Sequence, residues 1–317
     1  MKGLDIFCGG GGSSAGARLA GVDLAGAIDM CPVATDTYRA NFPGANVFTG
    51  RLEDIAISTV QKQIGSIDIL LASPECTNHT CAKGAAPRSE ASRATALYAV
   101  EYARTFRPRW LVLENVVHMR PWSRYGELKH ELEMLGYHLA EQVLDASDFG
   151  VAQSRRRLFL VGDLKQAPGL VKSRHSGRRK SVKSILDKSG TWNTSPLYSE
   201  RRAKDTLVRA ARAFDSLGED EPFLLVYYGS DGSGGWQPVT RPLRTITTVD
   251  RFALVEPGED GPRMRMLQVP ELRRAMGFDD NYKLEVGTRR DRVRILGNGV
   301  CPPVMTEVVK ALTLEQL

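Results

Sequence analysis

Residues 5–16 read DIFCGGGGSSAG: the end of a short apolar strand, a run of glycines, and then small residues that can begin a helix. Glycines at such a turn let the backbone approach a ligand closely, and the first turn of a following helix offers free N–H groups. A glycine-rich turn can bind a nucleotide-like ligand or can simply be tight. The stretch therefore predicts the first strand–turn–helix unit of an α/β sheet, with a candidate nucleotide site at its turn.

Short apolar runs alternate with helical patterns through the first 165 residues, which is typical of a parallel α/β sheet. We expect strands at 3–7, 24–28, 67–72, 110–114, 138–144 and 158–162. We expect helices near 14–19, 34–41, 91–106 and 125–135. Open α/β sheets bind ligands at the carboxyl ends of their strands, so the polar residues that follow these strands are candidate site residues.

The pattern changes after residue 165, where Ser, Lys, Arg and Gly become frequent and the periodicity fades. Residues 166–289 include β-like runs at 223–228 and 243–249, on either side of a turn-rich stretch. They predict a small, mostly β domain. Residues 1–165, completed by about 290–317, predict the larger one. Two lobes suit this length, because single cores usually stop growing at roughly 250 to 300 residues.

The composition is that of an ordinary globular protein, with 42% hydrophobic and 25% charged residues. No apolar run approaches the ~20 residues that a membrane helix needs, and the first residues do not resemble a signal peptide. Five cysteines without paired metal-ligand spacing predict free thiols in a reducing compartment and no metal site. We therefore expect a cytoplasmic protein with no membrane role.

The formal charge of +6 fits a polyanionic partner, and the basic residues gather at 155–157, 172–183 and 289–294. Within 153–157, strand alternation would point Arg155 and Arg157 to the same side. Phosphate contact is the functional interpretation of these clusters. A solvated surface is the alternative.

Two acids strengthen the nucleotide interpretation. Asp29 ends the second strand about 20 residues after the glycine turn, where a carboxylate can accept hydrogen bonds from both ribose hydroxyls. Asp54, in the sequence Glu53-Asp54-Ile55, is placed where an adenine amino group could be held, although a helix cap explains it equally well.

Cys76 follows an apolar strand, in a turn that holds Pro74, and a polar loop comes after it. A cysteine at a strand tip can act as a nucleophile, although such a residue can also simply be a small side chain in a turn. The strand that begins at Trp110 brings Glu114 to the same edge of the sheet. Burial could keep Glu114 protonated, so that it donates to a ring nitrogen.

The order of these features resembles that of the DNA cytosine C5-methyltransferases of bacteria and phages. The family's ordered motifs correspond here to 5–12, Pro74-Glu75-Cys76, Glu114-Asn115-Val116, 153–157 and Gly297-Asn298-Gly299-Val300, and its penultimate motif to 265–278. The resemblance extends over nearly the whole chain outside about 165–262.

The resemblance implies a Rossmann-like methyltransferase sheet with a smaller, mostly β target-recognition domain. It also implies that S-adenosyl-L-methionine methylates C5 of a cytosine that is flipped out of double-stranded DNA. By resemblance, the Cys76 thiolate adds to C6, Glu114 donates to N3, and Arg155 and Arg157 bind the base and the adjacent backbone. A base then removes the C5 proton, and elimination frees the enzyme.

The resemblance also supplies a set of cofactor-binding residues: Phe7, Gly9, Gly10, Gly11, Gly12, Asp29, Met30, Asp54, Ile55, Pro74, Asn298 and Gly299. It implies a monomer that acts on DNA, with a cognate restriction endonuclease as a candidate partner in a restriction–modification system. The loop 229–235 is a candidate for entering the DNA groove, and Trp236 or Gln237 for filling the vacated stack.

Two positions depart from the family: Glu75 replaces the proline before the nucleophile, and Thr77 replaces the glutamine after it. A carboxylate beside a thiol raises the thiol pKa from about 8.5 and lowers its thiolate fraction. Glu75 is therefore a tolerated variation, a sign of a modified pyrimidine substrate or unusual donor, or a sign of lost activity. Cytosine methylation in tRNA and a catalytically silent DNA-binding module are the alternative functions.

Overall fold

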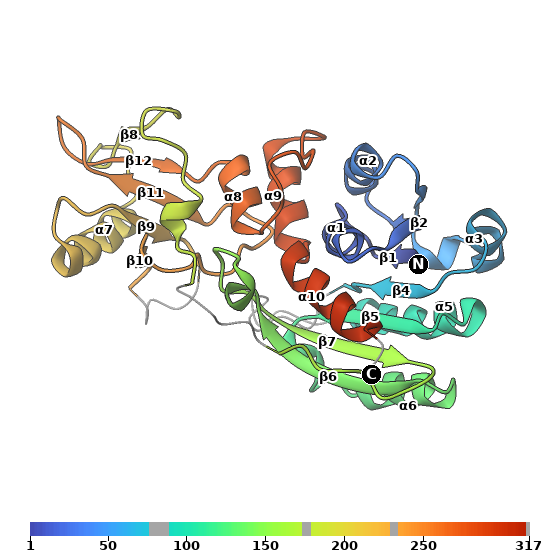
Figure 1. Cartoon of the computed structure of the whole chain (residues 1–317). Helices are drawn as coiled ribbons and strands as arrows, with labels where there is room; N and C mark the ends of the chain where they lie inside the picture. Colours follow the sequence, from blue (N-terminus) through green and yellow to red (C-terminus); the bar gives the residue numbers. More distant parts are fainter. Residues whose placement is uncertain (76–88, 173–178, 229–233, 315–317) are drawn as a thin grey trace.

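The structure is a computed structural model, and it describes residues 1–75, 89–172, 179–228 and 234–314. A seven-stranded sheet is built from the N-terminal half of the chain, and a five-stranded sheet from residues 195–266. The helices α8 (Val269–Ala275) and α9 (Arg289–Asn298) lie between the two sheets in Figure 1. The last helix, α10 (Pro302–Thr313), returns to the larger sheet.

The larger sheet has the strand order β3-β2-β1-β4-β5-β7-β6. Its strands are β1 (Lys2–Ile6), β2 (Asp23–Asp29), β3 (Asn46–Thr49), β4 (Ile69–Ala72), β5 (Trp110–Asn115), β6 (His138–Asp145) and β7 (Arg156–Asp163). All neighbouring pairs are parallel except the two pairs that β7 makes, with β5 and with β6. The expected α/β sheet is confirmed, with one reversed strand.

Two differences from the expected sheet have physical reasons. Strand β7 is antiparallel because residues 146–155 connect it to β6 without a crossover helix, and a parallel pair needs a crossover of a dozen or more residues. Strand β3 escaped prediction because it has only four residues on the edge of the sheet, and its partly exposed side chains leave no apolar run.

Helices cover both faces of this sheet. The helices α1 (Gly12–Leu19), α2 (Pro32–Asn41) and α10 pack on one face, and α3 (Ile57–Ile64), α5 (Tyr98–Phe106) and α6 (Tyr125–Met134) on the other. Strand alternation divides the core accordingly: Leu71 faces α10, whereas Leu70 faces α5. The single helix expected at 91–106 is divided into α4 (Glu90–Ala94), a 3₁₀ turn and α5, and α3 was not predicted.

The smaller sheet has the order β10-β9-β11-β12-β8 and is antiparallel. Its strands are β8 (Ser195–Pro196), β9 (Phe223–Val226), β10 (Trp236–Pro238), β11 (Phe252–Glu256) and β12 (Arg263–Met266). The helix α7 (Lys204–Leu217) packs on one face, and the other face joins the core of the larger part through Leu224 and Leu254. The division into two domains stays a prediction.

The prediction of a β-like run at 243–249 was wrong. Residues 243–249 form no strand there; instead Leu243 makes a single bridge to Gln153, outside the smaller sheet. The amide of Leu243 donates to the carbonyl of Ala152, and the amide of Ser154 donates to the carbonyl of Leu243. Within this run only Leu243 and Ile246 are buried, in the core cluster that includes residues of both sheets. The local sequence does not distinguish such a buried segment from a strand.

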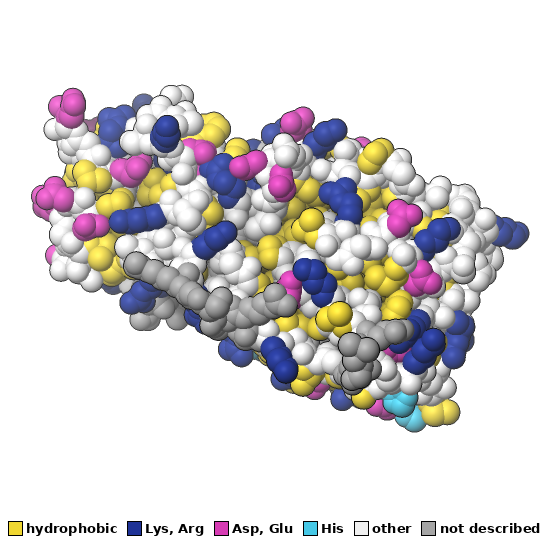
Figure 2. All heavy atoms as spheres, viewed as in Figure 1, with side chains coloured by type: hydrophobic (Ala, Val, Ile, Leu, Met, Phe, Trp, Pro, Cys, Tyr) yellow, Lys and Arg dark blue, Asp and Glu magenta, His cyan; other side chains and the backbone are white. Residues whose placement is uncertain are grey.

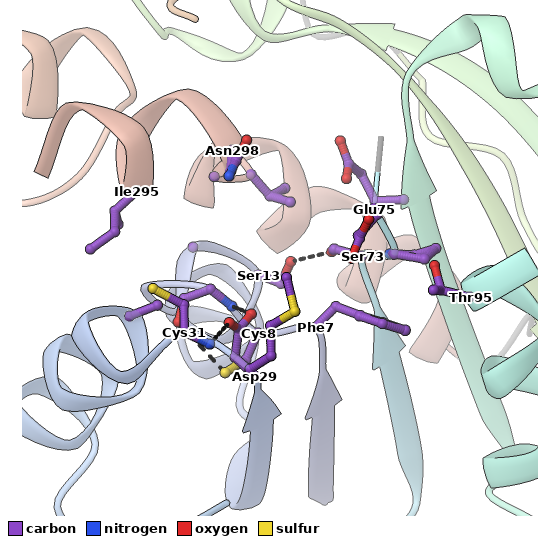
Figure 3. A pocket seen from close by; sticks show the side chains of 18 of the residues that line it. Phe7, Cys8, Ser13, Asp29, Cys31, Ser73, Glu75, Thr95, Ile295 and Asn298 are labelled. Carbon is purple, nitrogen blue, oxygen red and sulfur yellow. Dashed lines mark hydrogen bonds between the residues drawn. The ribbon is translucent and has the colours of Figure 1, made fainter. Parts of the chain in front are cut away.

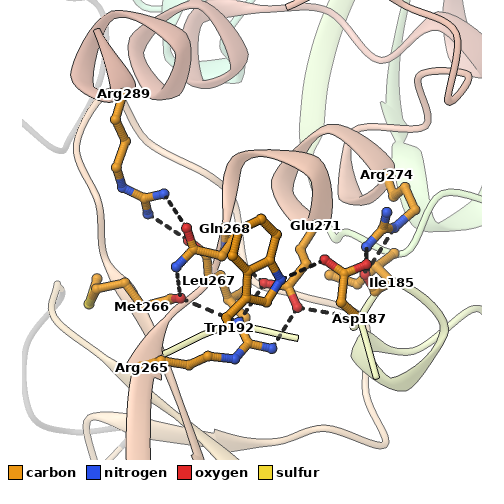
Figure 4. A network of polar contacts seen from close by, with 10 residues as sticks. All are labelled: Ile185, Asp187, Trp192, Arg265, Met266, Leu267, Gln268, Glu271, Arg274 and Arg289. Carbon is orange, nitrogen blue, oxygen red and sulfur yellow. Dashed lines mark hydrogen bonds and ion pairs between the residues drawn. The ribbon is translucent and has the colours of Figure 1, made fainter. Parts of the chain in front are cut away.

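A buried polar network attaches the smaller sheet to α8 (Figure 4). Arg265 of β12 donates to both oxygens of Glu271 at 2.7 Å, and the amides of Gln268 and Asp187 donate to the same carboxylate at 2.7 and 3.0 Å. Arg274 donates to Asp187 at 2.5 Å. Because Glu271 is fully buried, its charge is tolerated only through these four donors, which fix α8 against β12.

Among the described residues, none of the helices combines the length and the apolar character that crossing a lipid bilayer requires.

Asp5 of β1 is fully buried directly beneath the glycine turn. The Ser14 hydroxyl donates to it at 2.6 Å, and the Ser14 and Tyr38 hydroxyl oxygens lie 2.7 Å apart. Burial raises the pKa of Asp5 to about 7, although the Ser14 hydrogen bond opposes this rise. The folded protein therefore holds a proton on Asp5 at pH values where the unfolded chain has released it.

We predict that the free energy of unfolding falls as the pH rises from about 4 to 7, by up to about 1.4 kcal/mol per pH unit from Asp5 alone. Below this window Asp5 is protonated in both states, and above it Asp5 is ionised in both, so its contribution changes only within it. Urea unfolding of the wild type and of Asp5→Asn at each pH measures the effect. Parallel stability curves for the two proteins would contradict the prediction.

Candidate active site

A cavity of about 290 Å³ lies at the carboxyl ends of the central strands of the larger sheet (Figure 3). Its wall contains residues that follow β1, β2 and β4 and one residue near the end of β5, and it is closed by the last turn of α9 and the segment between α9 and α10. The volume is at the lower end of the usual range for small-molecule sites, roughly 300 to 1,000 Å³. This is the edge at which an open α/β sheet is expected to bind its ligand.

The glycine turn forms the floor of the cavity. Phe7 and Gly9 line it with φ angles of 58° and 51°. Gly12 also lines it, and a Cβ atom there would lie 2.3 Å from the carbonyl oxygen of Val300. A side chain at position 12 would therefore push the C-terminal segment away from the turn.

Gly10 and Gly11, in contrast, are not among the described residues that line the cavity. A Cβ atom at Gly10 would lie 2.4 Å from the Ile295 side chain, and one at Gly11 would lie 2.7 Å from the Phe42 ring. These two glycines give helices α9 and α2 room to pack behind the turn. Their structural use here is close packing.

Asp29 joins the end of β2 to the glycine turn. Its two oxygens accept hydrogen bonds from the amides of Gly9 at 2.9 Å and Cys31 at 2.8 Å (Figure 3). Burial raises the pKa of Asp29, and these two amide hydrogen bonds oppose the rise. Each carboxylate oxygen keeps a second acceptor site, so Asp29 can still accept hydrogen bonds from a ligand diol.

The outer end of the cavity is formed by Met30, which is half exposed, and by the 3₁₀ turn after β3. From that turn, Leu52 and Glu53 line the wall. Asp54 and Ile55, the two positions expected from sequence, are not among the described residues that line it. The predicted segment reaches the cavity, but through neighbouring side chains.

Glu114 lies at the inner end, at the end of β5, and is buried. Its Oε1 lies 3.2 Å from Nε of Arg157, whose side chain also lines the cavity. Burial raises the pKa of Glu114, while Arg157 and Arg155 act in the opposite direction. The protonated form of Glu114 therefore persists to a higher pH than in an ordinary carboxyl group.

Arg155 and Arg157 both line the cavity, whereas Arg156 between them is exposed, as strand alternation predicts. Arg155 is almost completely buried, and its guanidinium donates to the carbonyls of Ile246 at 3.0 Å and of Gly297 and Gly299 at 2.8 Å. Arg155 therefore holds together the start of β7, the segment near Ile246 and the α9–α10 segment.

The C-terminal segment contributes Asn298 and Gly299, both of which line the cavity as expected. Several other lining residues were not predicted individually, including Ser13, Ser73, Thr95 and Ile295, whereas Arg294 belongs to the basic cluster at 289–294. Asn115 was also overlooked as an individual residue: its side chain donates to the carbonyl of Pro74 at 3.1 Å and fixes the turn after β4. Its place directly after Glu114 was the available signal.

Cys76, Cys81 and 229–233 lie outside the described residues. Of the described cysteines, Cys8, Cys31 and Cys301 are free thiols. Pro74 and Glu75, which directly precede Cys76, line the cavity. Gln237 is buried in β10, and its amide is hydrogen-bonded with Pro242 and Arg244, which disfavours its insertion into DNA.

Many of the basic residues that the sequence grouped together have structural partners. Arg179 pairs with Asp148, Arg289 with Asp250, and Arg294 with Asp291. In the face shown in Figure 2, Lys and Arg side chains are interspersed with Asp and Glu side chains. The basic side chains on this face are therefore spread among acidic ones. The cationic side chains that line the cavity are a more specific indication of ligand binding than those on this face.

A family model described as C-5 cytosine-specific DNA methylase matches residues 1–314. The chain belongs to this family. The resemblance found in the motifs is thereby confirmed, and the match includes both sheets and the segment that closes the cavity.

Curated members of the methylase family are similar over nearly the full chain or over about half of it. Type II methyltransferase M.HgiDI of Herpetosiphon aurantiacus is 26% identical, over 99% of this chain and 94% of that protein. M.XorII of Xanthomonas oryzae pv. oryzae is 26% identical, over 99% and 85%. M.AgeI of Thalassovita gelatinovora is 30% identical over 51% of this chain, and that match spans only 39% of M.AgeI.

Solved structures share the fold of this methylase family member. A Spodoptera frugiperda DNMT2 mutant superimposes with a TM-score of 0.71 and 18% identity, over 98% of this chain and 99% of that one. A putative DNA modification methyltransferase encoded within prophage Cp of E. coli gives 0.69 and 18%, with 98% of each chain covered. The Rossmann-like methyltransferase fold expected from the motifs is confirmed.

We predict that Arg155→Lys lowers the free energy of unfolding by about 2 to 3 kcal/mol, because one ammonium group cannot replace a guanidinium that donates to three separate carbonyls. Arg156→Lys, at the exposed neighbouring position, is the matched control and should change little. Urea unfolding measures both. Equal stability of the two variants would show that the buried contacts of Arg155 are not needed.

Proposed function

We propose that the protein transfers a methyl group from S-adenosyl-L-methionine to C5 of a cytosine flipped out of double-stranded DNA, through a covalent adduct of Cys76. One observation carries the proposal: a single cavity extends from Asp29 and the glycine turn to the buried Glu114–Arg157 pair. The family match supplies the reaction class for these two ends.

The cavity lining fits the methyl donor at its outer end. Asp29 keeps acceptor sites for the two ribose hydroxyls, and Phe7 and Met30 offer apolar surface on which adenine can pack. Gly9 and Gly12 allow the backbone to approach closely, with Asn298 and Gly299 on the opposite wall. When bound, S-adenosyl-L-methionine supplies a methyl group on a sulfonium, which is an electrophile for a carbon nucleophile.

The inner end fits a pyrimidine. The Cys76 thiolate forms a bond to C6, and Glu114 donates to N3, so that the displaced electron pair makes C5 nucleophilic. Arg157 keeps Glu114 in place and, with Arg155, adds positive charge next to the base. After C5 takes the methyl group, a base removes the C5 proton and the bond between sulfur and C6 breaks.

DNA is the proposed substrate because relatives that match the whole chain are named Type II methyltransferases. The protein then acts as a monomer in the cytoplasm, beside a cognate restriction endonuclease. Bisulfite sequencing of DNA from cells that express the chain would reveal both the activity and the target sequence.

We predict that the wild type transfers labelled methyl groups from S-adenosyl-L-methionine to DNA, and that Cys76→Ser lowers this transfer by at least about 10³-fold, because a hydroxyl is a far weaker nucleophile than a thiolate. Assays with duplex DNA and with tRNA distinguish the DNA enzyme from a tRNA enzyme. A wild type that labels neither polymer yet shifts DNA in a gel would favour a silent DNA-binding module.

The raised pKa of Glu114 predicts a pH dependence. Because the protonated carboxyl is the form that donates to N3, single-turnover methylation should decline as the pH rises through this raised pKa. In Glu114→Gln the amide donates at every pH, so that the decline should disappear and a lower, flatter rate should remain. A decline that persists unchanged in this variant would assign it to another group.

A further inference from the structure

Glu75 lines the cavity after β4, a strand that lies between those that carry Asp29 and Glu114. Along the sheet, the end of β2 with Asp29, then β1, then the end of β4 with Glu75, and then β5 with Glu114 follow in order. Neighbouring strands lie about 4.8 Å apart. A donor held at Asp29 and a base held at Glu114 would therefore meet in front of the ends of β1 and β4, and Glu75 lines the wall after β4.

Most other charged side chains of this wall have charged or multiple partners. Arg51 pairs with Glu53, and Arg157 with Glu114, at 3.0 and 3.2 Å. Glu75, in contrast, accepts a hydrogen bond from the neutral hydroxyl of Ser92 at 2.5 Å, and within the described part of the chain it forms no ion pair. The hydrogen bond orients the carboxylate but leaves its charge in place.

The charge of Glu75 also reaches other groups in the cavity. It contributes to the raised pKa of Asp29, behind burial as the main cause. A positive charge placed between Asp29 and Glu114 would instead be attracted by the Glu75 carboxylate. The proline that the family carries at this position has no charge.

We propose that Glu75 makes the cavity prefer the positively charged methyl donor over the neutral S-adenosylhomocysteine that remains after transfer. The inference rests on the proposed function. Transfer of the methyl group turns a sulfonium into an uncharged thioether, so the attraction to Glu75 disappears when the product forms. Glu75 is thus a specificity-determining residue that favours exchange of product for fresh donor.

The test is isothermal titration of the full chain with each ligand separately, which gives the ratio of the S-adenosylhomocysteine Kd to the S-adenosyl-L-methionine Kd. Two unit charges several ångströms apart in a partly solvated site change a binding constant roughly three- to tenfold. Glu75→Gln should lower the ratio by that factor, chiefly through weaker donor binding. The glutamine amide oxygen can still accept the Ser92 hydrogen bond.

Two control variants separate charge from geometry. Ser92→Ala removes the hydrogen bond but keeps the carboxylate, so the ratio should stay near that of the wild type. Glu53→Gln removes a carboxylate at the outer end, beyond Asp29, where the two ligands are identical. It should change both affinities alike, and circular dichroism checks the fold of each variant.

A ratio that Glu75→Gln leaves unchanged would overturn the inference, and so would an equal fall in Ser92→Ala or Glu53→Gln. Failure of the wild type to bind either ligand would instead overturn the proposed cofactor and, with it, the proposed function. The supporting result is that the wild type binds both ligands and that the ratio of the two Kd values falls only in Glu75→Gln.

Discussion

The backbone of Val300 lies so close to Gly12 that only a hydrogen atom fits at the glycine, and the cavity depends on this contact between the two ends of the chain. It brings the α9–α10 segment over the turn that follows β1. Arg155, which directly precedes β7, holds the segment there because its guanidinium donates to the carbonyls of Gly297 and Gly299. This end of the cavity is therefore a product of long-range packing, in which Gly12 and Val300 come together from opposite ends of the chain.

Two carboxyl groups of the cavity, the partly buried Asp29 and the buried Glu114, lie in different environments. Burial raises the pKa of both Asp29 and Glu114. Asp29 is bonded by two backbone amides, which favour its ionised form and leave it an acceptor. Glu114 has the guanidinium of Arg157 at 3.2 Å, is also affected by the charge of Arg155, and lies at the inner end, where the proposed reaction needs a donor. The different neighbours of the two carboxyl groups suit the opposite tasks proposed for them, Asp29 as an acceptor and Glu114 as a donor.

The sequence predicted most of the sheet, and it predicted Asp29, Glu114 and Arg157 at the cavity, because each lies at or next to one end of a strand whose position is set by a local apolar run. It did not show that Gly10 and Gly11 serve helix packing, since their neighbours Ile295 and Phe42 approach only in the folded chain. Likewise, Leu52 and Glu53 replace Asp54 and Ile55 on the wall, because the 3₁₀ turn decides which side chains point inward. Alternation placed Arg155 correctly but could not reveal its three carbonyl partners.

Glu75 stands where the family has proline, and its place in the fold suggests an effect other than the one expected from the sequence. From the sequence, a carboxylate next to Cys76 only opposes ionisation of the thiol. In the fold, the carboxylate is turned to the Ser92 hydroxyl of α4 and lines the cavity between the two ends of the site. A negative charge that is unfavourable for a thiolate is favourable for a sulfonium, and the two effects act on different steps. In the proposed reaction, a substitution that slows formation of the Cys76 adduct can therefore be retained where binding of the donor, or release of the product, limits turnover.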